Sequence, residues 1–170
     1  MRIIVSDSSC LIDLRKASLL EAFLQLPYEI LIPNTLFEEE LLRFTEDEKR
    51  LLLQGLQVVD LPGSSVLRAQ QVIHDLPHLS IHDGFAFALA EVNPGCILLT
   101  GDGRLRALGA SNGMEVRGVL WIIDEIHTNT LTNVGVLLEA LRMFSSDPSV
   151  RLPRRSLVAY IKRYEGLMSA

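Results

Sequence analysis

Four acidic side chains from distant parts of the chain could together hold a hard metal cation. Asp7 and Asp102 each follow a short apolar run, Asp83 opens an alanine-rich stretch, and the run 38–40 supplies a glutamate. Two carboxylates about 4 Å apart repel by roughly 4 kcal/mol at an effective dielectric near 20. Four that converge would therefore need protonation or a cation. Magnesium suits them, because it prefers oxygen ligands and keeps several waters.

Each aspartate also has a structural explanation. Asp7 and Asp102 precede predicted helices, where an aspartate commonly caps the helix start. Asp83 stands three residues after Ser80, which is the spacing of a capping box. Two equivalent aspartates in one small domain nevertheless favour a shared site over two separate caps.

The glutamate is the least certain of the four acids. Thr35 and Glu38 have capping-box spacing, which gives Glu38 a structural role. On a helical wheel Glu40 lies beside the apolar stripe that contains Leu41, whereas Glu39 points away from it. Glu40 is therefore our candidate, and a fully solvated glutamate run is the alternative.

The elements that must position these acids alternate between apolar β-branched runs and helical patterns. This order predicts one α/β domain with a central parallel sheet of four to five strands flanked by helices. Strands are expected at 2–6, 29–32, 57–61, 96–100 and 116–121. Helices are expected at 9–25, 35–53, 65–75, 81–92, 103–112, 122–128, 132–144 and 154–165. We expect a core at 1–128 and a helical C-terminal extension at 129–170 packed on the same domain. Ligands of such sheets bind at the carboxyl ends of the strands, where Asp7 and Asp102 fall.

Composition and charge fit a globular chain with an uneven charge distribution. The chain is 48% hydrophobic and 22% charged, with a formal net charge of −5, which argues mildly against binding a polyanion through bulk charge. Residues 140–170, however, carry six Lys or Arg against only two acids, Asp147 and Glu165. This C-terminal region could hold a polyanion near a metal site, or it could be a solvated helix face.

Cellular location is indicated by three further features. No apolar run approaches the roughly 20 residues that span a bilayer, and the first residues lack a signal-peptide pattern. Cys10 and Cys96 lie in apolar stretches without metal-ligand spacing. They are expected to be reduced core residues of a cytoplasmic protein.

The order of these motifs resembles the PIN-domain family over about residues 2–125. An aspartate with two serines follows the first strand, an acidic helix follows the second, and Asp83 opens an alanine-rich helix. The sequence Thr100-Gly101-Asp102 follows the fourth strand. The stretch from there to Trp121 is particularly similar to bacterial and archaeal proteins related to the VapC toxins.

The resemblance implies a Mg²⁺- or Mn²⁺-dependent ribonuclease. Members are often homodimeric, and the toxin branch is neutralised by a small antitoxin protein. The four residues that match the family's acidic positions are Asp7, Glu40, Asp83 and Asp102. They would be catalytic and metal-binding, and Ser9 and Thr100 match its supporting hydroxyl positions. Metal-assisted hydrolysis of an RNA phosphodiester is the implied reaction.

Two other classes of function compete with this one. An aspartyl-phosphate enzyme of the haloacid-dehalogenase type needs a second aspartate two residues after the first, and Ser9 stands there. A PIN-like scaffold that binds RNA or protein without cleaving it remains open. Outside the four acids, His82, Arg104 and Arg106 are positioned where they could contact phosphate, although surface roles explain them as well.

Overall fold

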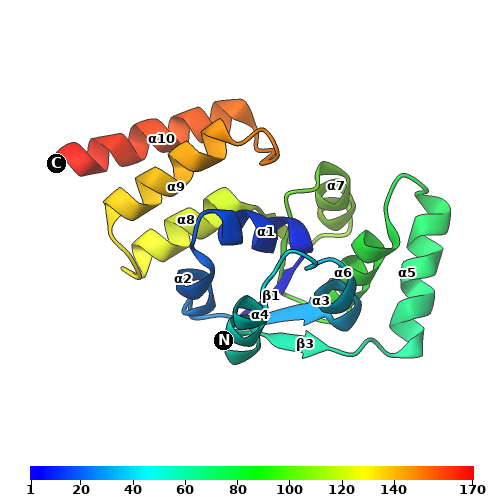
Figure 1. Ribbon diagram of the computed structural model, residues 1–170. Coiled ribbons are helices and arrows are strands. Elements are labelled where there is room, and N and C mark those ends of the chain that lie inside the picture. Colours follow the sequence, from blue (N-terminus) through cyan, green and yellow to red (C-terminus); the bar gives the residue numbers. More distant parts are fainter.

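A five-stranded parallel sheet forms the centre of the molecule (Figure 1). The computed structural model describes all residues, 1–170, and orders the strands β3-β2-β1-β4-β5. The strands are β1 (Ile3–Ser6), β2 (Glu29–Pro33), β3 (Gln57–Val59), β4 (Ile97–Leu99) and β5 (Glu115–Arg117). The chain builds β1, β2 and β3 outward in one direction and returns to place β4 and β5 on the other side of β1. The strand order therefore reverses between β1 and β4, which is where α/β sheets bind ligands.

Ten helices surround the sheet (Figure 1). They are α1 (Ser8–Lys16), α2 (Leu20–Leu24), α3 (Asn34–Glu39), α4 (Glu46–Gly55), α5 (Gly63–Asp75), α6 (Ile81–Glu91), α7 (Gly103–Ser111), α8 (Val119–Thr128), α9 (Val134–Ser146) and α10 (Arg154–Ser169). Neighbouring residues of β1 point to opposite faces of the sheet. Ile4 accordingly packs in a core with α1, α2 and α8 to α10, whereas Val5 packs with α5, α6 and α7. The predicted α/β fold is confirmed.

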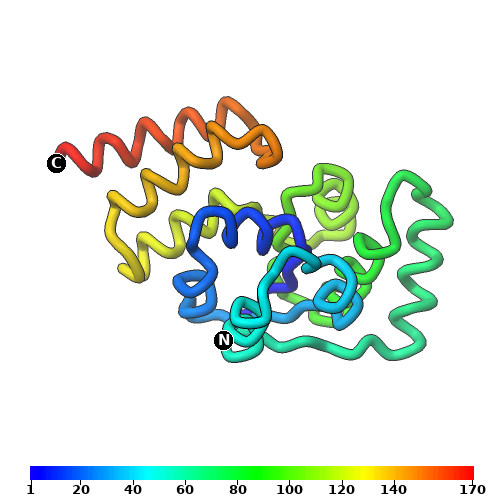
Figure 2. The backbone as a smooth tube through the Cα atoms, in the orientation of Figure 1, coloured from blue at the N-terminus to red at the C-terminus, as the bar shows by residue number.

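The C-terminal helices continue the larger of these two cores. Leu137, Leu141 and Phe144 of α9 and Tyr164 of α10 are almost fully buried in the cluster that also contains β1 residues. The Tyr164 hydroxyl donates to Oδ1 of Asp124 in α8 at 2.7 Å. Figure 2 shows α9 and α10 as a hairpin on the opposite side of the molecule from α5.

Two predicted helices are each divided in two. The segment 9–25 breaks at Ser18, which has a positive φ of 57° and separates α1 from α2. The segment 35–53 breaks after Glu39, and α4 begins with a capping box of Thr45 and Glu48. Helical periodicity persists across both breaks, so the apolar pattern alone did not reveal them.

The expected strand at 116–121 and the expected cap at Thr35 were wrong in part. The strand ends at Arg117, and Gly118 leads directly into α8, so Trp121 lies on a helix. The β-branched, apolar composition of this segment serves a buried helix rather than a longer edge strand. Helix α3 begins one residue early after Pro33 without a side-chain cap, so Thr35 forms no capping box and its Oγ1 has no hydrogen-bond partner.

Two smaller observations complete the fold. Cys10 and Cys96 are both free and buried, in different cores. No helix is both long and apolar enough to span a membrane.

Candidate metal centre

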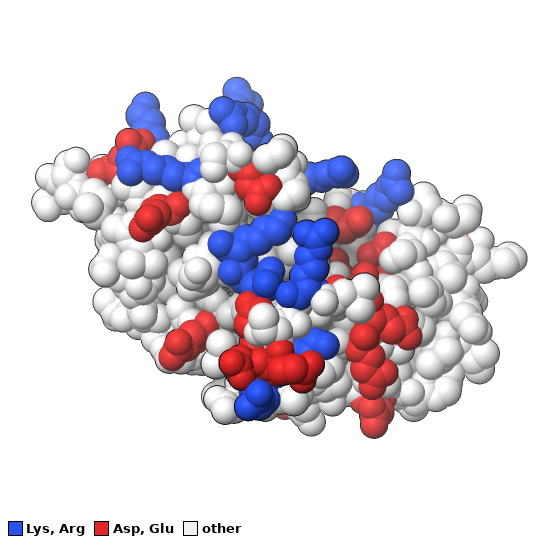
Figure 3. All heavy atoms as spheres, in the orientation of Figure 1, with Lys and Arg blue, Asp and Glu red and all other residues white.

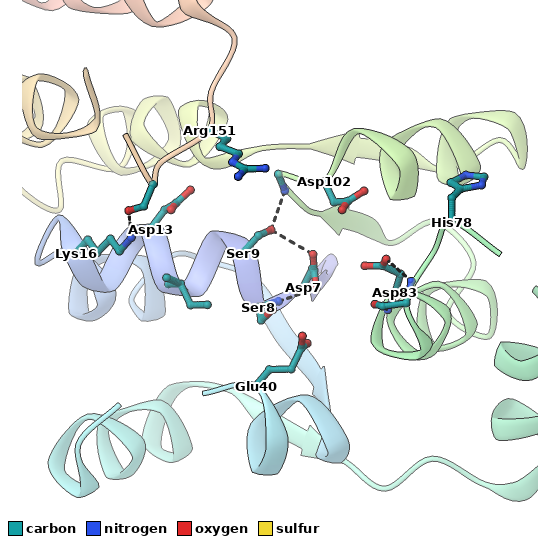
Figure 4. A pocket seen from close by; sticks show the side chains of 14 residues that line it. Asp7, Ser8, Ser9, Asp13, Lys16, Glu40, His78, Asp83, Asp102 and Arg151 are labelled. Atoms are coloured by element: carbon teal, nitrogen blue, oxygen red, sulfur yellow. Dashed lines mark hydrogen bonds between the residues drawn. The ribbon is translucent and has the colours of Figure 1, made fainter. Parts of the chain in front are cut away.

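A polar cavity of about 510 Å³ opens where β1 and β4 end, and all four predicted acids line it. Fourteen residues form its wall, and Ile12 is the only hydrophobic one. In Figure 4, Asp7 lies between Glu40 and Asp102, with Asp83 facing them from α6. The four carboxylates come from four separate elements, so only the folded chain brings them together.

Asp7 is the most enclosed of these acids, with 5% of its surface exposed. Its Oδ1 accepts a hydrogen bond from the backbone N–H of Ser8 at 2.8 Å. Its Oδ2 accepts from the hydroxyls of Thr100 at 2.9 Å and Ser9 at 3.2 Å. Asp7 thus caps α1 and is held by both hydroxyl residues named from the sequence.

The same two hydroxyls tie β1 to the loop after β4. Ser9 Oγ accepts from the backbone N–H of Gly101 at 2.9 Å, and Thr100 Oγ1 accepts from that of Asp102 at 3.0 Å. The orientation of Asp7 is therefore coupled to the position of Asp102. Such a linked, half-buried polar network fixes geometry because every lost partner would leave a costly unsatisfied group.

Burial raises the pKa of Asp7 from its usual 3.8 to about 6. The hydrogen bond from Thr100 opposes this shift, and the negative charges of Asp83 and Glu40 add to it. Like charges that disfavour one another's ionisation are the signature of carboxylates gathered in one site. A cation in the cavity would relieve this repulsion.

Asp83 and Asp102 each use one carboxylate oxygen at a helix start. Asp83 Oδ2 accepts from the backbone N–H of Ser80 at 2.9 Å, and the predicted capping box is confirmed. Asp102 Oδ1 accepts from the backbone N–H groups of Arg104 and Leu105 at 2.8 and 3.0 Å. The second oxygen of each carboxylate accepts no hydrogen bond from the protein. These aspartates can therefore be structural caps and still offer an oxygen to a ligand.

Glu40 lies at the C-terminal end of α3 and faces the cavity from below in Figure 4. Its Oε1 is buried without a hydrogen-bond partner, and Nδ1 of His82 is 3.9 Å away. Burial raises the pKa of Glu40, and His82 opposes that shift. A buried unpaired carboxylate oxygen is costly unless something binds it. Glu38 and Glu39 do not line the cavity.

The sequence did not reveal a fifth acid or the basic groups beside it. Asp13 and Lys16 line the cavity from α1, and Arg151 does so from the loop between α9 and α10. Burial raises the pKa of Asp13 to about 6, and Lys16 opposes that shift. Asp13 follows Ser9 by four residues, which places both on one face of α1, so spacing could have found it. Figure 3 shows basic side chains gathered over α1, with acids below and to the right of them.

The donor set fits a hard cation better than a soft one. The acids stand apart, since no three His, Cys, Asp or Glu side chains form a ready-made ligand cluster. Magnesium is commonly held by one or two carboxylates together with waters and a substrate phosphate, which fits spaced carboxylates. No cysteine lines the cavity and His78 is the only histidine that does, so the wall lacks the nitrogen and sulfur ligands typical of zinc.

The sheet order and the acid-lined cavity at its switch point define an α/β protein with a candidate cation site. A PIN-domain family model matches residues 3–164, which is nearly the whole chain. The chain therefore belongs to the PIN-domain family, whose members are generally nucleases that use divalent metal ions. A search of curated proteins found no match.

Proposed function

We propose that the chain is a Mg²⁺- or Mn²⁺-dependent endoribonuclease. The observation that carries the proposal is the convergence of Asp7, Glu40, Asp83 and Asp102 on one polar cavity. The membership of the PIN-domain family supports it. Asp83 and Asp102 each keep an oxygen free of protein hydrogen bonds, which leaves that oxygen available to a metal ion.

Asp7, Asp83 and Asp102 would hold the cation. When bound, Mg²⁺ supplies positive charge that offsets the charge developing on the phosphate and favours ionisation of the attacking water. The network of Ser9 and Thr100 keeps Asp7 in place, since both hydroxyls donate to its Oδ2. The ends of β1 and β4 thereby fix Asp7 and Asp102 relative to each other before substrate arrives.

Glu40 is placed to act on the water rather than only on the cation. Glu40 lines the cavity, and its raised pKa suits a group that accepts a proton and holds it. A direct ligand role is the other option for this carboxylate. Lys16 and Arg151, which line the same cavity, would hold the phosphodiester beside the acids.

The finer biological role rests on the resemblance in sequence to VapC-like proteins. A toxin function, a small antitoxin partner and a homodimer remain predictions of that resemblance. Val136, Val158, Leu167 and Met168 on α9 and α10 are exposed apolar side chains, and they would be suitable contacts for either partner.

The first test is cleavage of a mixed pool of structured RNA. Three reactions are compared: wild type with Mg²⁺, wild type with EDTA, and Asp102→Asn with Mg²⁺. Asp75→Asn, an exposed aspartate outside the cavity, is the matched control. Cleavage that needs Mg²⁺, persists in the control and is lost in Asp102→Asn supports the proposal. Products identical to those of a reaction without protein, in all cases, would favour the scaffold function.

A further inference from the structure

A second cavity adjoins the acidic one and carries the opposite charge. It measures about 820 Å³, and Gly101 and Arg151 belong to the walls of both cavities. Its wall contains Arg106, Arg117 and Arg151 and no Asp or Glu. We call it the arginine groove. It lies between the start of α7, the β5–α8 junction and the loop that leads into α10.

Two of its three arginines have no carboxylate partner. Arg106 and Arg151 are exposed and form no ion pair with the protein, whereas Arg117 pairs with Glu115 at 3.3 Å. Arg68 and Arg163, which line no such cavity, are paired with acids, whereas four other arginines are also unpaired: Arg43, Arg104, Arg154 and Arg155. Unpaired positive charge concentrated in a concave wall favours an anionic ligand.

The backbone around Gly118 accommodates one of these side chains. A Cβ at Gly118 would lie 2.9 Å from Nη1 of Arg106, so the guanidinium rests directly on the turn that leads into α8. The guanidinium therefore lies against the backbone of the groove wall, while Arg106 as a residue stays exposed to solvent. Helices α8 and α10 also begin at this groove without side-chain caps.

The remaining wall is apolar and partly aromatic. Trp121 and Tyr160 line the groove and are half-buried, and the Arg117 guanidinium lies 5.7 Å from the Trp121 ring centroid. Positive groups combined with aromatic surface are what single-stranded nucleic acid binds, since phosphates need charge and bases need an apolar contact. A duplex would present its bases inward and could not use the aromatic wall.

We propose that the arginine groove binds the single-stranded RNA segment next to the phosphate held in the acidic cavity. This inference rests on the proposed ribonuclease function and names where its substrate continues. Arg151, at the boundary, would contact the phosphate shared by both cavities, and Arg106 would contact the next one along the strand. The groove also resolves the mismatch between a net charge of −5 and a polyanionic substrate, because the positive charge is local.

The test measures RNA binding in EDTA, so that it does not depend on cleavage. Fluorescence anisotropy of a labelled single-stranded RNA decamer of mixed sequence gives Kd at several salt concentrations. The variant is Arg106→Gln combined with Arg151→Gln. The matched control is Lys49→Gln combined with Arg50→Gln, which removes the same charge from α4, a helix outside both cavities.

We expect weaker binding and a shallower salt dependence in the groove variant only. Each lost phosphate contact reduces the slope of log K against log salt by about 0.7 for single strands, so the double variant should lose about 1.4. The same Kd and slope as the control would overturn the proposal and leave the groove to a protein partner. Equal losses for a duplex of the same length would overturn the single-strand assignment.

Kinetics separate this proposal from the proposed function. If the chain cleaves RNA, the single variant Arg106→Gln should raise KM with little change in kcat, because Arg106 lines only the groove and would contact substrate and transition state alike. RNA binding that depends on the groove, without any cleavage by the wild type, would refute the proposed ribonuclease function and support the groove as an RNA-binding site. Cleavage by the wild type with an unchanged KM in the Arg106→Gln variant would support the ribonuclease function and refute the groove as an RNA-binding site.

Discussion

Replacing Asp7 with asparagine should change how the stability of the protein depends on pH. In the folded chain burial raises the pKa of Asp7 from 3.8 to about 6. Between those values the folded protein keeps a proton that the unfolded chain has already released. The free energy of unfolding therefore falls as pH rises through this window, because the folded state binds more protons than the unfolded state.

The size of the effect follows from the shift. About two pKa units correspond to roughly 3 kcal/mol of lost stability at neutral pH. Part of this stability is already lost at about pH 4.5. The free energy of unfolding should therefore fall by roughly 2 kcal/mol between about pH 4.5 and about pH 8. Asparagine does not titrate. Its altered hydrogen bonds with Ser8 and Thr100 add an offset that does not depend on pH, and this offset cancels in the comparison.

The assay is urea unfolding of the wild type and Asp7→Asn in EDTA at both pH values. Between the two pH values, the free energy of unfolding of the wild type should fall by about 2 kcal/mol more than that of the variant. Asp13, whose pKa burial also raises, is present in both proteins and cancels. Parallel pH profiles would refute the claim that Asp7 is forced to ionise at a cost. Added Mg²⁺ at about pH 8 should stabilise the wild type more than the variant, because only the wild type carries a negative charge at position 7.

Substitutions at three further positions test the other members of the site. Asp102→Ser should abolish cleavage but keep the stability of the wild type, because serine can still cap the helix. Asp102→Ala should abolish cleavage and also lose about 1 kcal/mol of stability with the helix cap. Thermal melts and the RNA cleavage assay check both variants. Glu40→Gln should lower kcat by roughly two orders of magnitude or more, as for a lost general base, while Glu39→Gln should not; equal rates for the pair would remove Glu40 from the chemistry. Ser9→Ala should cost about 1–3 kcal/mol of unfolding free energy, because it leaves the Gly101 N–H without its acceptor; urea titration measures this.

The positions of the aspartates followed from simple rules about sheets. Buried apolar runs at Ile3–Ser6 and Ile97–Leu99 predicted central parallel strands, and their carboxyl ends fixed where Asp7 and Asp102 would meet. Asp83 followed from the capping-box spacing with Ser80. These inferences needed only local pattern and topology, both of which a sequence contains.

The placement of other residues in the site could not be predicted from local sequence pattern and sheet topology. The helical wheel assumed that a helix continued through Glu40, whereas α3 ends there and Glu40 reaches the cavity from the helix terminus. Arg151 lies in a loop after α9, and only the packing of the C-terminal hairpin brings it to the sheet edge. Loop conformation and helix–helix packing depend on contacts between distant residues, which periodicity does not describe.

The four acids divide by what holds them, and this division predicts where metal binding and folding are coupled. Asp83 and Asp102 gain stability from the helix starts that they cap. Asp7 also caps α1, but burial raises its pKa and that of Glu40. A cation should therefore stabilise the fold mainly through Asp7 and Glu40, since their charges are the ones that the apo protein tolerates at a cost. Among the four proposed ligands, the cost of ionisation without a metal thus falls mainly on two residues, although four would serve the chemistry.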